Sequence, residues 1–387
     1  MPQNPPVLHD IQDPKWGLRA YLAVHSVEGG LAFGGLRVDP NVTADMVQGL
    51  AARMAMKLSG HGSPVGGAKA GICADPNDPN LPGMLRAFAQ HCRDELTSRT
   101  ILGKDMGAKD WMLETIYAAL GMPQLGLVRR RNPDATFPEK IGNLAGYIDR
   151  MTGQGVLWAV QEALDQSLVG KRILIQGAGA VGIGVATRLV EAGARVIGMS
   201  DRLNAVHDQS GLPLAYLEAA KGNDGLLPTH LRPTGAQVMN RDSLLQLDAD
   251  VLILAAGSLL IDSKTASTFR CPVVVEGANF PLLPDARQWL HEHGVWVVPD
   301  VVASSSSAAM VAYQMASANT CEVRGLWNAI RTNIETNVRR SKEMSDRHGV
   351  DTVKAFSMMM ADPVSASVPV RPPRAGSPVA IADLTEV

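Results

Sequence analysis

The stretch from Arg172 to Asp201 constrains the fold more than any other part of the chain. It reads RILIQGAGAVGIGVATRLVEAGARVIGMSD, which predicts a strand, a tight turn, a helix and a second strand. The turn, Gly177 to Gly182, is a GxGxxG sequence, and an acidic residue closes the second strand. This order predicts a dinucleotide-binding unit of a doubly wound parallel sheet.

The turn and the acid also predict the cofactor. Glycines let the backbone approach a pyrophosphate, and a helix N-terminus faces its charge. Asp201 can accept hydrogen bonds from the adenosine ribose and would repel a 2′-phosphate, which favours NAD over NADP, although Arg202 beside it weakens that preference. A doubly wound domain that binds no dinucleotide is the alternative. The cofactor-binding residues expected here are Gly177, Gly179, Ala180, Val181, Gly182, Asp201 and Arg202.

Further apolar runs extend the predicted sheet. Residues 251–256, 272–277 and 295–303 read as strands, and they alternate with expected helices at 241–247, 262–268 and 283–293. Ligands of open α/β sheets bind at the carboxyl ends of strands. Those ends place Ala255, Ala256, Gly277 and Asn279 near the cofactor. Asn279 can bond a carboxamide; a simple turn residue is the other interpretation.

Two lysines occupy unexpected positions between Phe33 and Ile72. Lys57 falls on the apolar arc of a predicted helix that begins near Thr43, and Lys69 lies in PVGGAKAG among small apolar residues. A lysine that loses hydration has a pKa below its usual value of about 10.4, which suits an acid/base group. The alternative is that each ammonium reaches water along an apolar face.

Asp105 is a third candidate. It lies between Gly103 and Gly107 after a short apolar run. An acid in such a loop can face a cleft, but spacing alone favours a helix cap ahead of Trp111.

Composition excludes several other functions. The net charge of −2 over 387 residues gives no basic excess for nucleic acid or an acidic membrane. The four cysteines have neither zinc nor disulfide spacing, so we expect no metal and reduced thiols in a cytoplasm. The N-terminus is too polar for a signal peptide, and no apolar run is long enough to span a membrane.

The chain resembles the Glu/Leu/Phe/Val dehydrogenase family from about Leu18 to Asn319, and more its leucine, phenylalanine and valine branch than its glutamate branch. The resemblance rests on motifs that occur in the family's order: Gly34-Gly35-Leu36-Arg37, Met56-Lys57, Pro64 to Lys69, Lys104 to Gly107, Thr152 to Val156, the GxGxxG turn, Val275 to Asn279 and Pro299-Asp300. The lysine segment together with a later GxGxxG is a specific combination.

The resemblance implies two α/β domains with a cleft between them. Residues 1–135 would form a substrate-binding and oligomerisation domain, and residues 136–324 a Rossmann NAD-binding domain. A helix at 325–350 would pack back on the first domain, and the Pro-rich tail, 361–387, would be disordered. The family forms homo-oligomers through its first domain, so we expect a dimer or a larger assembly.

The resemblance also implies roles. Lys57 would hold the substrate α-carboxylate, Lys69 would activate water, and Asp105 would exchange protons with the amino group, which overrides the capping interpretation. Thr152 and Asn279 would contact the nicotinamide carboxamide. The family reaction converts an L-amino acid, NAD and water to a 2-oxo acid, ammonia and NADH, reversibly.

Departures from the family pattern indicate the substrate. Phe33 stands where glutamate enzymes carry a lysine, and Val311 where they carry a serine, so an apolar or aromatic side chain is expected. Gly103 would leave room for a large group, and Gly34 and Ala308 would also line the substrate site. Ser304 to Ser307 replace an Asn-Ala-Gly-Gly run.

Three alternatives remain beside this enzyme. One is a family member with an altered reaction on a 2-oxo acid or imino acid in specialised biosynthesis. Another is a non-catalytic NAD-binding protein. The third is a different two-domain Rossmann enzyme, which the lysine segment disfavours.

Overall fold

A computed structural model describes residues 6–124, 126–131, 151–165, 167–220, 226–228, 235–257, 260–316 and 323–361. Contacts divide the chain into two compact units. The first unit contains the described parts of Met1–Asn143 together with Ala308–Ala329. The second contains the described parts of Leu144–Ser307 and Ile330–Pro369.

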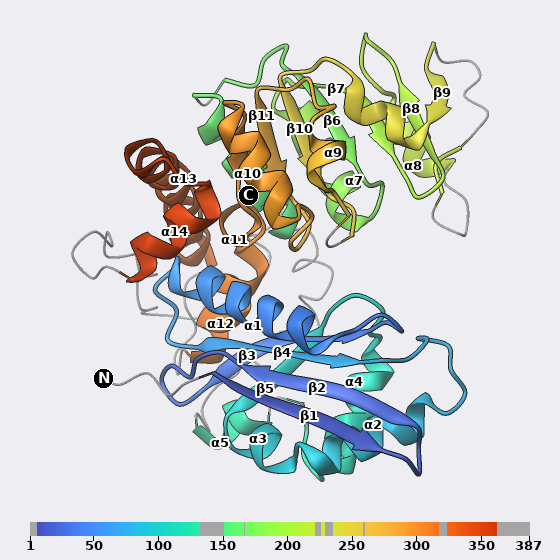
Figure 1. The fold of residues 1–387 in the computed structure, drawn as a ribbon, viewed down its shortest axis with the longest axis vertical. Helices are drawn as coiled ribbons and strands as arrows, with labels where there is room; N and C mark the ends of the chain where they lie inside the picture. The colour runs from blue at the N-terminus through green and yellow to red at the C-terminus, as the bar shows by residue number, and fades with distance from the viewer. Residues whose placement is uncertain are drawn as a thin grey trace. The chain divides into compact units, whose positions relative to one another are not determined.

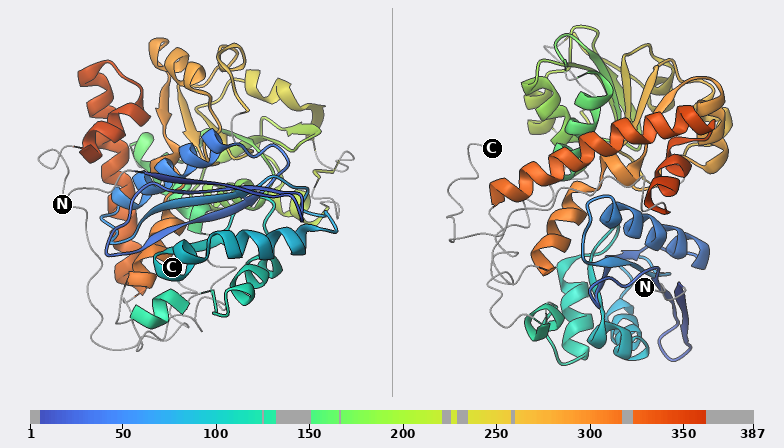
Figure 2. Two further views of the ribbon diagram at one scale, coloured as in Figure 1. Left: turned by 60° about the horizontal axis from the view of Figure 1, so that its bottom comes forward. Right: turned by 90° about the vertical axis from the view of Figure 1, so that its left-hand side faces the viewer.

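The first unit is built on a five-stranded sheet in the order β1-β2-β4-β3-β5 (Figure 1). Strand β3 is parallel to β4 and β5, while β2 is antiparallel to β1 and β4. Helix α1 packs on one face, and α2 and α4 lie on the other (Figure 2). The strands are β1 (Val7–Asp13), β2 (Leu18–Val24), β3 (Ala32–Val38), β4 (Gly66–Ile72) and β5 (Thr100–Lys104). The helices are α1 (Ala44–Ser59), α2 (Leu81–His91), α3 (Arg93–Ser98), α4 (Asp110–Ala119) and α5 (Gly126–Arg131).

Local sequence explains how α1 meets this sheet. Thr43 caps the helix by accepting a hydrogen bond from the Met46 amide at 3.2 Å. Strand β4 is buried along its whole length. A Cβ on Gly67 would lie 2.2 Å from the Ala55 nitrogen of α1, so only glycine lets the helix approach this strand.

The second unit contains a seven-stranded sheet in the order β12-β11-β10-β6-β7-β8-β9 (Figure 1). The five strands from β12 to β7 are parallel, and β8 and β9 extend the sheet as antiparallel strands that the sequence did not predict. Strand order reverses between β6 and β10, which is where doubly wound sheets bind ligands. The strands are β6 (Arg172–Gln176), β7 (Arg195–Ser200), β8 (Asn204–His207), β9 (Gln237–Asn240), β10 (Val251–Leu254), β11 (Val273–Glu276) and β12 (Trp296–Val298).

The helices of the second unit include residues 151–163 and the element α7 after the glycine turn. The others are α8 (Leu214–Ala219), η1 (Arg241–Gln246), α9 (Ser263–Ala266), α10 (Pro284–Glu292) and α11 (Asp300–Ala303), with α7 spanning Ala180–Glu191. Helix α12 (Ser306–Ala316) begins in the second unit and continues into the first. Helices α13 (Val323–His348) and α14 (Thr352–Ala361) complete the described chain, α13 as one long rod (Figure 2).

The structure corrects two sequence expectations. Residues 295–303 are not one strand, because Pro299 lacks an amide hydrogen and starts α11 directly after β12. The helix expected at 325–350 groups with the first unit only up to Ala329. Beyond it the chain groups with the second unit, where Arg339 bonds Glu162 at 2.6 Å and Thr352 bonds the Val297 carbonyl at 2.6 Å.

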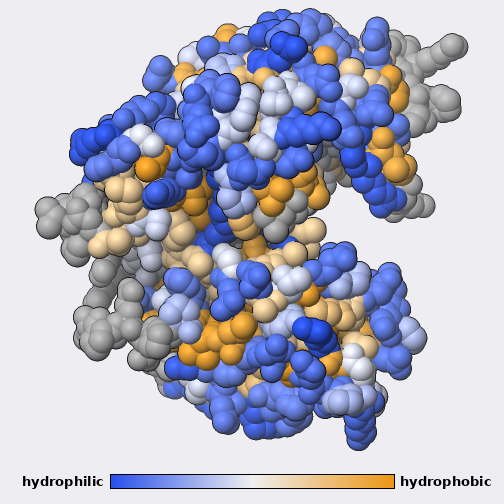
Figure 3. Space-filling model, viewed as in Figure 1, coloured by the Kyte–Doolittle hydropathy of each residue, from blue (hydrophilic) through white to orange (hydrophobic). Residues whose placement is uncertain are grey.

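Polar side chains cover most of the face drawn in Figure 3, with apolar atoms scattered between them. Among the described residues, no helix is long and apolar enough to cross a membrane. The expected tail lies outside the described residues from position 362 onward.

Candidate active site

A cluster of three charges forms where β3, β4 and β5 run side by side. Asp105, directly after β5, accepts a hydrogen bond from Arg37 of β3: the Nε–Oδ2 distance is 2.9 Å. Lys69 of β4 lies 2.8 Å from the same oxygen. The lysine and the arginine side chains are each 4% exposed, so the cluster is shielded from water.

Burial and mutual attraction set the proton affinities in this cluster. Burial lowers the pKa of Lys69, an effect that Asp105 opposes and Arg37 reinforces. Burial alone would raise the pKa of Asp105, but the charges and hydrogen bonds of Lys69 and Arg37 lower it to about 2. The cluster therefore combines an ionised carboxylate with a lysine that gives up its proton more readily than usual.

Strand register explains why these residues converge. Side chains two apart on a strand share a face, and Phe33 pairs with Gly67 while Gly35 pairs with Gly103. The face that carries Lys69 and Asp105 is thus the one on which α1 packs. Lys57, in the last turn of α1, is buried at 5% exposure, which confirms that it points inward.

Gly35 makes room for the cluster. A Cβ at this position would lie 2.8 Å from the Asp105 Cβ and 3.2 Å from the Lys69 Nζ. Gly34, which the sequence analysis expected at the substrate site, lies on the sheet face opposite to the cluster. A Cβ on Gly34 would lie 1.8 Å from the Ala68 carbonyl oxygen. Gly35 therefore borders the charges, and Gly34 lets β3 and β4 pack closely.

Asp105 is not a helix cap. Helix α4 begins at Asp110 with Lys109 at the capping position, five residues after Asp105 in sequence. The capping interpretation is wrong because the carboxylate turns toward the two cations and away from the helix start.

The positions expected to select the substrate lie on three elements, β3, β5 and α12. Phe33 is buried on β3, and its ring lies 3.3–3.4 Å from where a Cβ on Gly103 would stand. The Phe33 ring therefore packs directly against the backbone of Gly103, where a larger residue would crowd it. Ala308 and Val311 lie three residues apart on α12, and hence on one side of it, with 8% and 9% exposure.

The glycine turn of the second unit fits a dinucleotide. Gly177 has φ of +108°, and a Cβ there would lie 2.6 Å from the Ala255 oxygen. A Cβ on Gly182 would lie 1.8 Å from the Gly177 oxygen, so α7 packs tightly against the turn. Gly179 faces open space, and among the described residues no side chain caps the start of α7, where Ala180 and Val181 lie. The open helix N-terminus is suited to a pyrophosphate.

Asp201 follows β7 as predicted, but its carboxylate also organises its own loop. One oxygen accepts hydrogen bonds from the Leu203 and Asn204 amides, each at 2.7 Å, and the other from the Leu227 amide at 2.6 Å. Each carboxylate oxygen can accept two bonds, so one position remains for a ribose hydroxyl. Arg202 is exposed beside it.

The remaining predicted cofactor residues gather at neighbouring strand ends. The Ala255 amide bonds the Gln176 carbonyl at 2.7 Å, and the Ala278 amide bonds the Leu254 carbonyl at 2.8 Å, which brings Ala256, Gly277 and Asn279 to the reversal point of the sheet. Thr152 hydrogen-bonds Ser307 at 2.9 Å, and Ser306 bonds the Met151 carbonyl at 2.6 Å. The serine run thus anchors the helix that carries Thr152.

The sequence did not single out Arg37, Gly35 or Ser307. An arginine on a strand reads as a solvent-facing residue, and only the register of three strands shows its partner. In the part of the chain that the structure describes, no group of three acidic, histidine or cysteine side chains could hold a metal ion.

These features are compatible with a dinucleotide-dependent oxidoreductase that carries a buried lysine cluster in a separate unit. Family models agree: residues 9–120 match "Glu/Leu/Phe/Val dehydrogenase, dimerisation domain" and residues 146–365 match "Glutamate/Leucine/Phenylalanine/Valine dehydrogenase". The chain belongs to the Glu/Leu/Phe/Val dehydrogenase family and is an amino-acid dehydrogenase.

Individual relatives support this assignment. The NAD-specific glutamate dehydrogenase of Staphylococcus aureus (strain COL) is 30% identical over 305 residues, which cover 77% of this chain and 72% of that protein. The catabolic NAD-specific glutamate dehydrogenase of Bacillus subtilis (strain 168) is 31% identical over 306 residues, which cover 77% and 70%.

Solved structures share the fold. The hetero-hexameric glutamate dehydrogenase from Thermus thermophilus, in a Leu-bound form, matches with a TM-score of 0.71 and 25% identity over 93% of this chain and 88% of that one. The L-tryptophan dehydrogenase from Nostoc punctiforme matches with a TM-score of 0.64 and 20% identity over 93% and 95%. The second likeness concerns the fold alone.

Proposed function

We propose that this protein catalyses the NAD-dependent oxidative deamination of an apolar or aromatic L-amino acid to its 2-oxo acid and ammonia, and the reverse reductive amination. The buried Lys69–Asp105 pair carries the proposal, because it supplies a base and an anion on one sheet face. When bound, NAD accepts the hydride from the substrate α-carbon.

The charged cluster performs the proton transfers. In the described part of the chain both bonds to Asp105 end on Oδ2, which leaves Oδ1 for the substrate amino group. A pKa of about 2 keeps this carboxylate ionised, so it accepts a hydrogen bond from the substrate ammonium. When Lys69 gives up its proton it no longer lowers the pKa of Asp105, and the carboxylate then becomes a stronger base for the substrate proton. Loss of the hydride then gives an imino acid.

Lys69 completes the reaction by hydrolysis. Its lowered pKa increases the neutral fraction, which takes a proton from the water that adds to the imino carbon. Proton return to the nitrogen releases ammonia and leaves the 2-oxo acid. Lys57, buried in the last turn of α1, holds the α-carboxylate.

Phe33 supports an apolar substrate side chain. Its ring lies on the sheet face of the cluster and packs against the backbone of Gly103, which adds no side chain there. A glutamate γ-carboxylate would lose its hydration beside this ring and gain no cation from that residue, which costs free energy. Val311 and Ala308 on α12 add apolar surface. The two curated relatives are named for glutamate, so this preference rests on these substitutions.

NAD is preferred over NADP for two reasons. Asp201 keeps one acceptor position for a ribose hydroxyl, and its charge repels a 2′-phosphate. The curated relatives described above are NAD-specific. Asp201 also holds its own loop, so a test of this preference compares the ratio of the NAD and NADP affinities.

We further infer a homo-oligomer, because residues 9–120 match a dimerisation domain. Light scattering during size-exclusion chromatography is expected to give a multiple of the 41.2 kDa chain mass. A mass of one chain would contradict this inference.

The deciding experiment follows NADH consumption with ammonia and four kinds of 2-oxo acid: branched-chain acids, phenylpyruvate, indolepyruvate and 2-oxoglutarate. Turnover on an apolar acid but not on 2-oxoglutarate is expected. Lys69→Ala should abolish turnover while NADH still binds; normal turnover would overturn the mechanism. If no oxo acid is turned over although NADH binds, an altered reaction or a non-catalytic NAD-binding protein is favoured instead.

A further inference from the structure

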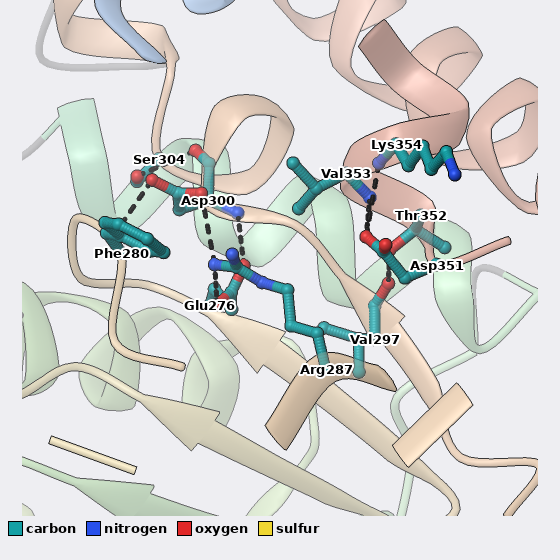
Figure 4. Close-up of polar contacts among 10 residues, drawn as sticks. All are labelled: Glu276, Phe280, Arg287, Val297, Asp300, Ser304, Asp351, Thr352, Val353 and Lys354. Atoms are coloured by element: carbon teal, nitrogen blue, oxygen red, sulfur yellow. Dashed lines mark hydrogen bonds and ion pairs between the residues drawn. The ribbon is translucent and has the colours of Figure 1, made fainter. Parts of the chain in front are cut away.

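A buried network of three charged side chains lies beside Phe280, the residue that follows Asn279 in sequence (Figure 4). Glu276 ends β11, Arg287 lies in α10, and Asp300 opens α11. Both carboxylate residues are 0% exposed and the arginine is 5% exposed. Burying three charged groups is costly, so a network of this kind needs partners that hold each charge.

The charges do hold one another. The Arg287 Nη2 lies 2.5 Å from the Glu276 Oε1 and 3.9 Å from the Asp300 Oδ1. The second Glu276 oxygen accepts a hydrogen bond from the Asp300 amide at 3.0 Å, and it thereby ties the start of α11 to the end of β11. Asp351, drawn beyond Arg287 and Val297 in Figure 4, accepts hydrogen bonds from the Val353 and Lys354 amides and so caps α14.

Two residues of the network, Asp300 and Arg287, contact Phe280, the residue after Asn279. The Phe280 amide donates to the Asp300 Oδ2 at 3.0 Å. The Arg287 guanidinium carbon lies 5.0 Å from the centre of the Phe280 ring, within reach of a cation–π contact. Phe280 also has φ of +55°, a left-handed conformation that is unfavourable for a bulky residue. Surrounding contacts must impose such a conformation, and the network supplies them.

The same aspartate connects to the serine run. The Ser304 hydroxyl donates to the Asp300 carbonyl at 2.9 Å, and three residues later Ser307 bonds Thr152. Asp300 therefore joins the two positions expected to meet the nicotinamide carboxamide, one through Phe280 and the other through the serines.

We propose that Glu276, Arg287 and Asp300 are positioning residues that fix Asn279 in the conformation that binds the carboxamide. The proposal rests on the cofactor role of Asn279 in the proposed function. None of the three side chains needs to touch the cofactor. Asp300 is central because its carboxylate, its amide and its carbonyl each make one of the connecting bonds.

A double-mutant cycle tests the proposal on the full-length protein. Asn279→Ala, Asp300→Ala and the double variant are compared for NADH affinity by fluorescence and for the KM of NAD. Asp300→Ala is expected to raise the KM of NAD by about tenfold, and to add little once Asn279 is already alanine. The KM of the amino acid should stay unchanged, because its binding residues lie in the other unit.

Matched variants separate positioning from general stability. Asp250 also accepts a hydrogen bond from a backbone amide, that of Arg172 at 2.7 Å. It precedes β10 and so lies at the amino ends of the parallel strands, whereas Asn279 follows the carboxyl end of β11. Asp250→Ala should therefore leave the KM of NAD unchanged. Asp300→Asn keeps an oxygen for the Phe280 amide, so it should restore part of the affinity lost in Asp300→Ala; it also replaces that variant in the cycle if the alanine form does not fold.

The outcomes distinguish the two proposals. If Asn279→Ala leaves NAD binding unchanged, the cofactor role of Asn279 is wrong. If Asn279→Ala weakens binding but the effects of the two single variants multiply, or Asp300→Ala alters only thermal stability, the positioning proposal is overturned and the cofactor role stands.

Discussion

At the scale of single residues, the Asp105 carboxylate and its two cations govern one another's protonation. The positive charge of Arg37 lowers the pKa of Lys69, while the negative charge of Asp105 raises it. Removing the arginine charge should therefore raise the pH at which Lys69 becomes an active base, and removing the aspartate charge should lower it.

Arg37→Gln is expected to shift the pH profile of kcat/KM for oxidative deamination toward alkaline pH. Loss of the arginine charge raises the pKa of Lys69, so the neutral base forms only at higher pH. The measurement is the rising limb of the profile, with Arg19→Gln, which removes an exposed arginine of strand β2, as the control. An unshifted or acid-shifted limb would show that Lys69 is not the titrating base.

Phe33→Lys is expected to raise kcat/KM on glutamate, by about tenfold or more, because a cation would then stand beside the γ-carboxylate. Activity on the preferred apolar substrate should fall. Initial rates on both substrates give the ratio, and Phe33→Leu serves as a control that changes size without adding charge. If Phe33→Lys gives no gain in activity on glutamate, Phe33 does not line the pocket for the substrate side chain.

Residue-level reasoning predicted part of this cluster. Lys57 and Lys69 stood out because lysine is rare among apolar neighbours, and both are buried. Asp105 was also a candidate, but its spacing alone favoured a cap, and only the resemblance to the dehydrogenase family gave it a catalytic role. Arg37 was missed because its partner comes from another strand, 68 residues away, and no local pattern encodes that pairing.

At the scale of secondary-structure elements, the turn before α7 separates glycines needed for folding from a glycine available for binding. Gly177 and Gly182 have no room for a side chain, whereas Gly179 has ordinary φ and nothing within 4 Å of the place that a Cβ would take. Within this one motif, Gly177 and Gly182 are therefore required for packing, whereas Gly179 is required only to leave room for a ligand.

Gly179→Ala is expected to weaken NAD binding while the melting temperature stays unchanged. The added methyl fits the free protein but occupies the space through which a pyrophosphate approaches the α7 amides. Gly49→Ala on α1 is the matched control; it also has open space, and it should stabilise the protein by about 0.5–1 kcal/mol without affecting NAD. Calorimetry and NADH titration measure the two effects. Equal NADH affinity in both variants would place the pyrophosphate elsewhere.

Elements were predicted where the pattern was long, and missed where one residue changed the backbone. The strand, turn and helix from Arg172 to Glu191 agree with the expectation. The run at 295–303 misled because valines on both sides of Pro299 look like one strand. The proline converts the second half into a helix start, and that conversion is what places Asp300 beside Glu276.

At the scale of the whole molecule, Asp105 makes stability depend on acidity. Its folded pKa of about 2 lies below the ordinary value of 3.8, so the folded state holds this proton less tightly than the unfolded chain. The stabilisation is fully present above the ordinary value and is lost as the pH falls through the folded value.

The free energy of unfolding of the wild type, minus that of Asp105→Asn, should therefore shrink as the pH falls from about 4 to about 2. The expected change is on the order of 2 kcal/mol. Urea unfolding at a series of pH values measures it, with Asp110→Asn, which removes an exposed carboxylate of α4, as the control. A constant difference would mean that Asp105 is not held in its ionised form.

The two α/β units were predictable at this scale because the motifs of each domain are separate in sequence. The assignment of the C-terminal segments was not, since it depends on contacts between residues far apart in the chain. The described parts of residues 308–329 group with the first unit, and residues 330–361 group with the second. Within the first unit Tyr313 bonds the His61 carbonyl across more than two hundred positions.

This division into interleaved segments has a consequence for how the protein is made. The first unit is assembled from an early piece of the chain and from residues 308–329, which the ribosome releases only after the second unit's sheet has been synthesised. The lysine-bearing sheet must therefore wait, during translation, for α12 to emerge before its own core is complete. A nascent chain halted before residue 308 should accordingly be a target for chaperones and proteases, whereas one released after residue 361 has every described element of both units.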